Sequence, residues 1–66
     1  MKTLPGTRLV NANQLQIGDI LLNDDGSYDS TVEDVFTDYD DSGKTWLDTG
    51  DTMGYLSSHQ KFLIEE

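Results

Sequence analysis

Apolar and polar residues alternate over short stretches of this chain, and apolar residues do not recur at the spacing of a helix face. Clusters of Gly, Asp, Asn and Ser that favour turns separate these stretches about every ten residues. The pattern therefore predicts short antiparallel strands. The predicted strands cover residues 7–10, 19–23, 30–39, 44–48, 52–56 and 61–65.

The densest apolar run, residues 15–22, is interrupted in its middle by Gly18-Asp19. Gly adopts positive φ at little steric cost, and an Asp carboxylate bonds back to nearby amides, so this pair predicts a sharp corner. The apolar residues after the corner would enter a buried strand. We expect Leu15 and Ile17, just before it, to close one end of a small core.

The longest predicted strand, residues 30–39, does not alternate cleanly between apolar and polar positions. Val32 and Val35 are three positions apart, so a regular strand would place them on opposite faces. For both to point inward, the strand must bend or carry a bulge between Glu33 and Asp34, as strands do at barrel corners.

Residues 11–15 contain cap-forming side chains but too few positions for a full helix, which predicts a single helical turn. We expect one domain over residues 1–66: an all-β fold, as a small antiparallel SH3-like or Hint-like barrel of five or six short strands. The expected core residues are Leu9, Leu15, Ile17, Ile20, Leu22, Val32, Val35, Trp46, Leu47, Leu56, and Leu63 or its neighbours Phe62 and Ile64.

The 66 residues include no cysteine, so neither a disulfide nor a thiolate metal site can support the fold. No apolar run approaches the roughly 20 residues that span a bilayer. Residues 1–6 lack the apolar segment of a signal peptide. We expect a soluble, cytoplasmic protein.

Charge is the unusual part of the composition, with 13 Asp and Glu against 4 Lys and Arg. Ten of the acidic residues lie between Asp24 and Asp51, opposed only by Lys44, and they account for the whole net charge of −9. Such a field repels nucleic acid and anionic membranes, so we expect no direct binding to either. It favours cations and proteins with a basic surface.

A spaced pattern runs through the first half of the chain. It consists of Val10, Ala12, Leu15, Gly18 and Asp19, followed by Asp25-Gly26, Val32 and Val35. It resembles the V-x-A-x-x-L-x-x-G-D…D-G…V-x-x-V pattern of small uncharacterised β proteins from actinobacteria and their phages. It is also similar to the opening strands of Hint (hedgehog/intein) domains. The resemblance implies a small barrel and a phage origin, hence a host cytoplasm.

The resemblance to Hint domains does not extend to their catalytic residues. Leu4 stands where the splicing nucleophile, a Cys or Ser, would be expected, and Leu56 replaces the Thr of the Thr-x-x-His block that ends at His59. His59 is the only histidine, and neighbouring serines on a turn do not by themselves make a nucleophile–base pair. We therefore expect no enzymatic activity and no catalytic residue.

A possible metal site begins at Asp38, where Asp38-x-Asp40-x-Ser42-Gly43 matches the first half of an EF-hand loop. Position twelve of that loop would be Thr49 instead of the bidentate Glu. Ca²⁺ on Asp38, Asp40 and Ser42 is thus the one cofactor to consider. The alternative is an acidic hairpin turn whose side chains accept backbone amides.

The acidic middle of the chain suggests a partner-binding surface, and its aromatic residues suggest hot spots within it. Trp46 is expected in the core instead. One hypothesis is a monomeric module that binds a basic protein. The alternative is a nucleic-acid mimic that inhibits a host DNA- or RNA-binding or defence protein, and a third is that the charge serves only solubility. The candidate binding residues are Asp24, Asp25, Asp38, Tyr39, Asp40, Asp41, Asp48, Asp51 and Tyr55.

Overall fold

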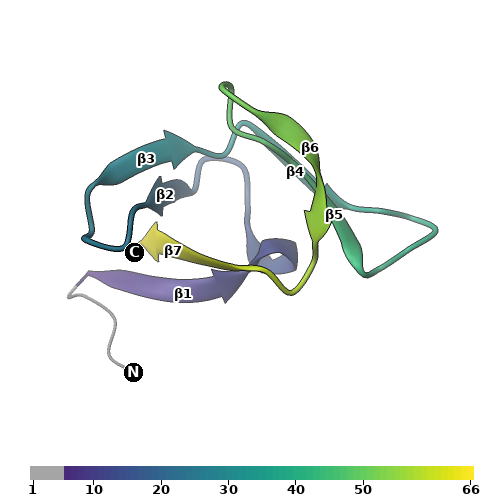
Figure 1. Cartoon of the computed structure of the whole chain (residues 1–66), viewed down its shortest axis with the longest axis horizontal. Coiled ribbons are helices and arrows are strands. Elements are labelled where there is room, and N and C mark those ends of the chain that lie inside the picture. The colour runs from purple at the N-terminus through teal and green to yellow at the C-terminus, as the bar shows by residue number, and fades with distance from the viewer. Residues whose placement is uncertain (1–5) are drawn as a thin grey trace.

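The computed structural model describes residues 6–66, which form seven strands and one 3-10 turn (Figure 1). The all-β prediction is confirmed, while the expected five or six strands become seven because the chain breaks within the long predicted strand. Leu4 and Pro5 lie outside the described residues. The elements are β1 (Thr7–Asn11), η1 (Ala12–Gln14), β2 (Ile20–Leu22), β3 (Tyr28–Thr31), β4 (Asp34–Thr37), β5 (Lys44–Asp48), β6 (Met53–Ser57) and β7 (Lys61–Glu65).

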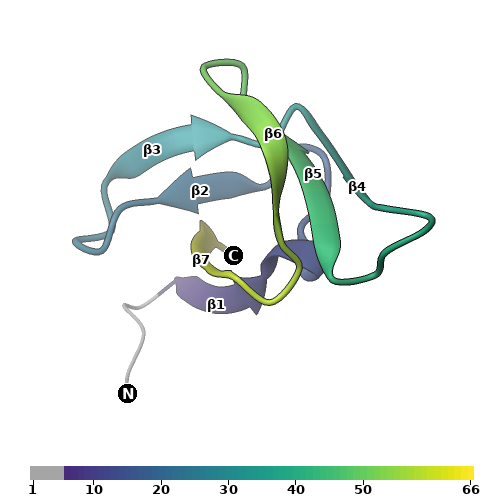
Figure 2. The ribbon, with the colours of Figure 1, turned by 45° about the vertical axis from the view of Figure 1, so that its right-hand side comes forward.

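The strands form two antiparallel sheets, one with the order β1-β7-β2-β3 and the other with the order β4-β5-β6. In Figures 1 and 2 the strands of the three-stranded sheet run across the direction of the others. Strand pairing among the described residues does not join the sheets into a closed barrel. The closed form of the predicted barrel is therefore absent, and the core lies between two open sheets.

One corner carries the chain from the first sheet to the second. The Val32 amide donates to the Asp19 carbonyl (2.9 Å) beside β2, and the next amide, of Glu33, donates to the Asp48 carbonyl (2.8 Å) in β5. Consecutive amides thus bond to different sheets. The predicted bend is present, centred on Val32 and Glu33 instead of after Glu33. It lets Val32 and Val35 both face the core, as expected.

The predicted corner at Gly18-Asp19 is also present. Gly18 has φ +94°, the Asp19 amide donates to the Gln16 carbonyl (3.0 Å), and the Asp19 carboxylate accepts from the Gln16 amide (2.8 Å). This four-residue turn places Ile17 at its tip. Ile17 is 68% exposed, so the prediction that it closes the core is wrong, whereas Leu15 is buried as predicted.

Several core predictions differ from the structure by one residue, which places the neighbouring side chain in the core. Val10 is buried in β1 and Leu9 is exposed, so the prediction of Leu9 is wrong; in β2, Leu21 is buried and its neighbours are half-buried. Alternate residues of a strand face opposite sides, so choosing the wrong neighbour exchanges inside and outside. The buried cluster is Val10, Leu15, Leu21, Val32, Leu47 and Ile64, with Val35, Leu56 and Phe62 packed against it.

The predicted helical turn is the 3-10 turn η1, which follows β1 directly. Its Ala12 is fully buried and donates its amide to the Gln60 carbonyl (2.8 Å), which ties the turn to the start of β7. The Gln14 side chain accepts from the Asn11 amide (2.8 Å) at the entrance of the turn. Residues 6–66 contain no helix long and apolar enough to cross a membrane.

Candidate functional site

Three aromatic side chains form a row across the three-stranded sheet. Phe36 of β4 lies opposite Trp46 of β5, which lies opposite Tyr55 of β6. The positions form a row, but all three rings touch one another: Phe36 and Trp46 stack with centroids 6.2 Å apart, and Tyr55 meets Trp46 edge to face at 5.2 Å and Phe36 edge to face at 6.3 Å. Such arrangements are favourable for aromatic rings, so the row is a preformed surface.

The aromatic row faces away from the core. Thr45 and Leu47, on either side of Trp46, are buried, which places the Trp46 side chain on the outer face of β5. Phe36 is 48% and Tyr55 53% exposed, while Trp46 is half-buried between them. The prediction of Trp46 as a core residue is therefore wrong, because the strand register turns its neighbours inward.

Two carboxylates lie on the same outer face, at the next outward-facing position of β4 and β5 beside the row. Asp34 of β4 is directly opposite Asp48 of β5, and the next position across the sheet is the exposed Met53 of β6. Directly opposed like charges destabilise a strand pair. The Asp48 carboxylate accepts from the Gly50 amide (2.8 Å), and Asp34 has no side-chain partner among residues 6–66. A cation bound here would relieve their repulsion.

The predicted acidic binding residues are distributed over three turns. Asp24 and Asp25 lie in the β2–β3 turn, the residues 38–41 in the β4–β5 turn, and Asp51 in the β5–β6 turn. The first two turns are at opposite ends of the molecule in Figures 1 and 2. Of the predicted set, Asp48 and Tyr55 lie together on the outer sheet face. The other predicted residues lie in the three turns.

The turn between β4 and β5 uses its carboxylates to bind its own backbone. Asp38 accepts from the Asp40 amide (3.3 Å), and Asp41 accepts from the Gly43 amide (2.9 Å). These bonds correspond to the hairpin-turn alternative for the Asp38, Asp40 and Ser42 motif. No three His, Cys, Asp or Glu side chains of residues 6–66 are grouped as a metal site would require. Tyr39, at the tip, is 99% exposed.

The β2–β3 turn holds one carboxylate in the same way. The Asp25 carboxylate accepts from the Ser27 hydroxyl (2.6 Å) and from the Ser27 amide (2.9 Å). The hydroxyl bond, followed by the amide bond, lowers the pKa of Asp25 below its ordinary value of 3.8, because both bonds favour the charged form. This carboxylate therefore supports the turn.

His59 is exposed in the turn between β6 and β7, and the hydroxyls of the two neighbouring serines bond to groups other than its imidazole. The Ser57 hydroxyl accepts from the His59 amide (3.3 Å), and the Ser58 hydroxyl bonds to Thr45 inside the protein (2.8 Å). Neither hydroxyl is hydrogen-bonded to the imidazole. These hydrogen bonds stabilise the turn and anchor it to β5.

No family model, curated protein or solved structure matches this chain. The resemblance to small actinobacterial and phage β proteins and to Hint domains therefore stays a prediction. Sequence reasoning identified Tyr55 and Asp48, but it missed Phe36 and assigned Trp46 to the core. The available signal was an aromatic residue in each of three successive strands; recognising a row required the register of their pairing.

Proposed function

We propose that this chain is a non-enzymatic interaction module that binds a basic surface of another protein through the outer face of β4, β5 and β6. The observation that carries the proposal is the exposed row of Phe36, Trp46 and Tyr55. Aromatic residues dominate the energetics of protein interfaces, and contiguous exposed apolar patches mark interaction sites.

The carboxylates beside the row define the chemistry of the partner. An Arg or Lys side chain lying on the Trp46 or Tyr55 ring would gain a cation–π contact. Its charged head would then lie near Asp34 and Asp48, which are directly opposite each other in the strand pair. A basic partner thus gains from both groups at once.

The acidic turns contribute at longer range. With a net charge of −9, the molecule attracts a basic partner from a distance and accelerates association, an effect that salt weakens. The proposal includes a monomer in the cytoplasm, or in the host cytoplasm if the chain is phage-encoded. Two short-stranded sheets joined by the bend between β3 and β4 support an SH3-like arrangement as the finer description of the fold.

The test is affinity capture from cell lysate followed by measurement of the recovered partner's affinity for three proteins: the unmodified chain, Tyr55→Ala and Tyr28→Ala. Tyr28 is an exposed tyrosine on β3 in the other sheet (64% exposed, against 53% for Tyr55), so it serves as the matched control. We expect Tyr55→Ala to weaken binding by about tenfold or more, as for a hot spot, and Tyr28→Ala to leave it unchanged.

Nucleic-acid mimicry predicts a different result. Binding would weaken in graded steps as Asp38, Asp40 and Asp41 are replaced by Asn, would depend steeply on salt, and would be displaced by free DNA. Equal effects of Tyr55→Ala and Tyr28→Ala together with this charge dependence would overturn the proposal for the aromatic row.

A further inference from the structure

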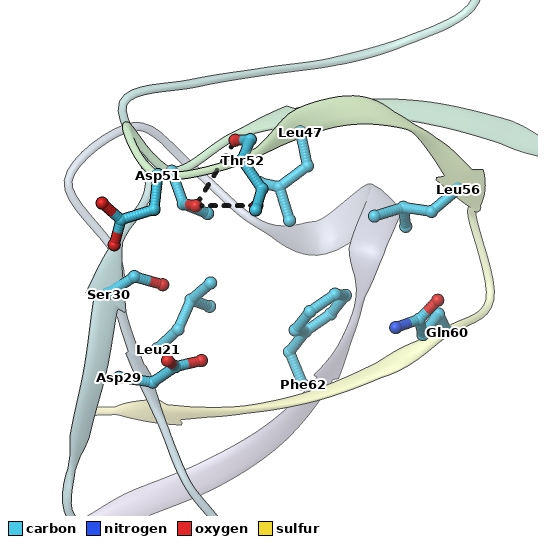
Figure 3. A pocket seen from close by; sticks show the side chains of 10 residues that line it. Leu21, Asp29, Ser30, Leu47, Asp51, Thr52, Leu56, Gln60 and Phe62 are labelled. Carbon is cyan, nitrogen blue, oxygen red and sulfur yellow. Dashed lines mark hydrogen bonds between the residues drawn. The ribbon is translucent and has the colours of Figure 1, made fainter.

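A cleft of about 330 Å³ opens between the two sheets, on the inner side of β5 and β6 (Figure 3). Its floor is apolar, and one end carries hydroxyl and carboxylate groups. Pockets of this size with an apolar lining and a few polar groups are typical of ligand sites. The apolar lining residues are Leu21, Leu47, Leu56 and Phe62.

A β-bulge brings Asp29 to the rim of this cleft. In the pairing of β2 with β3, Leu21 lies opposite Ser30 and Leu22 lies opposite Tyr28, so Asp29 is the extra residue. Consecutive residues of a regular strand point to opposite faces. Here Asp29 and Ser30 both line the cleft, because the bulge redirects one of the side chains.

Ser30 provides an unpaired polar group inside the cleft. It is only 8% exposed, and its hydroxyl has no hydrogen-bond partner among residues 6–66. Figure 3 shows the hydroxyl directed into the cleft, between Asp29 and Asp51 in that view. The hydroxyl oxygen is not enclosed, so it is open to the cleft and can accept a hydrogen bond from a group bound there.

The carboxylates at this end have no cationic partner within the described chain. Asp51 lies in the β5–β6 turn, which the Thr49 amide closes by donating to the Thr52 carbonyl (2.9 Å). Neither Asp29 nor Asp51 makes a side-chain hydrogen bond or ion pair with residues 6–66, and no Lys or Arg of this range lines the cleft. The charge of the cleft is therefore uniformly negative.

We propose that this cleft binds a lysine side chain of a partner protein. The aliphatic stem would lie on the Leu and Phe floor, as lysine stems do on apolar surfaces. The ammonium group has three donors, and the end of the cleft offers three acceptors: Asp29, Asp51 and the Ser30 hydroxyl. The ligand thereby places a positive charge between the two carboxylates and donates a hydrogen bond to the Ser30 hydroxyl.

This site is separate from the aromatic row. Leu47 and Leu56 face the cleft, whereas their strand neighbours Trp46 and Tyr55 face outward. The inference therefore goes beyond the proposed function, and each surface has its own reporter residues.

The test is an NMR titration of the whole chain with the peptide acetyl-Ala-Lys-Ala-amide. We expect saturable shifts confined to amides around the cleft, such as Ser30, Leu47 and Thr52, with a dissociation constant on the order of 1 mM. Acetylating the lysine Nζ removes its charge, and the acetylated peptide should bind with an affinity lower by about tenfold or more.

Three variants and one control examine the polar end. Asp29→Asn, Asp51→Asn and Ser30→Ala should each weaken the lysine peptide by about threefold or more, and Ser30→Ala should not lower stability, since its hydroxyl has no partner to lose. Asp24→Asn removes the same charge from the β2–β3 turn, outside the cleft, and should change nothing.

Four results would overturn the proposal, three of them in the experiments above. These three are an equal effect of Asp24→Asn, which would mean general attraction to the acidic protein; equal binding of the acetylated peptide; and absence of saturable shifts at the cleft. Tighter binding of free n-butylammonium than of the peptide would also overturn it, because the cleft would then be a small-molecule site. These outcomes leave the Tyr55 experiment unaffected.

Discussion

The hydroxyl oxygens of Thr45 and Ser58 lie 2.8 Å apart, and both residues are completely buried. Thr45 is in β5 and Ser58 follows β6, so the bond fixes the end of one strand against the turn that leads into β7. The Ser58 amide also donates to the Gly43 carbonyl (2.9 Å), next to β5. A buried polar pair thus holds the three-stranded sheet to its exit turn.

Removing both partners of this pair should cost less than the sum of the two single removals. Ser58→Ala leaves the Thr45 hydroxyl buried without a partner, and we expect a loss of about 1–3 kcal/mol in the free energy of unfolding. Thr45→Val combined with Ser58→Ala leaves no orphan hydroxyl, so its effect should fall below the sum of the single effects. Urea denaturation of the four proteins measures this; strict additivity would show that the hydroxyls are not coupled.

Two isoleucines should respond very differently to truncation. Ile64 is 1% exposed in β7, the strand that pairs with both β1 and β2, and Ile64→Ala should destabilise by about 2–5 kcal/mol. Ile17 projects from the tip of its turn, and Ile17→Ala should change stability by less than about 0.5 kcal/mol. Thermal unfolding of both variants decides the point. A large loss from Ile17→Ala would contradict its exposed position.

These two isoleucines also illustrate what sequence patterns could predict. Gly18 and Asp19 encode their turn locally, through positive φ and a carboxylate that accepts a nearby amide, so the turn was predictable. The side to which Ile17 points depends on its place within that turn, and hydrophobicity alone assigned it inward. The prediction of Leu9 as a core residue was wrong for a similar reason: alternation defines two faces of a strand but does not determine which one the core covers.

The binding surfaces depend on contacts between distant parts of the chain. Phe36, Trp46 and Tyr55 form a row only once the register of three strands is fixed, and no local pattern specifies that register. Asp29 reaches the cleft through a bulge in the pairing of β3 with β2. The residues that flank Asp29 in the sequence do not predict this bulge. The acidic residues, in contrast, were conspicuous in the sequence, yet most of them occupy separate turns.

Glycine substitutions can separate backbone strain from packing. Gly18 has φ +94° and open space where a Cβ would lie, so Gly18→Ala should cost about 1 kcal/mol through backbone conformation alone. A Cβ at Gly54 of β6 also meets nothing within 4 Å, and its φ lies outside the positive range. Gly54→Ala should therefore be neutral or slightly stabilising, since it restricts the unfolded chain. Denaturant midpoints compare the two; equal losses would refute the assignment to φ.

The Asp25–Ser27 turn should contribute to stability in a pH-dependent way. Because the folded-state pKa of Asp25 lies below its ordinary value of 3.8, its contribution is present above that value and is lost as the pH falls through the folded-state pKa. Ser27→Ala removes the larger cause, the hydroxyl bond, while the amide bond remains. The pKa of Asp25 should then rise toward 3.8, as followed by NMR titration of its carboxyl carbon. An unchanged titration curve would exclude the hydroxyl as the cause.

Replacing Asp34 should raise the stability of the fold and weaken partner binding. It lies directly opposite Asp48, so Asp34→Thr removes like-charge repulsion and introduces a good strand-forming residue. We expect the free energy of unfolding to rise by about 0.2–1 kcal/mol, and the stabilising effect of added salt to decrease, because less repulsion remains to be screened. The same variant should bind the basic partner more weakly, mainly through slower association. Asp24→Asn, with the same change in net charge in a distant turn, serves as the control for both measurements. A variant that is more stable and binds with unchanged kinetics would remove Asp34 from the proposed surface, because its charge would then affect the sheet alone.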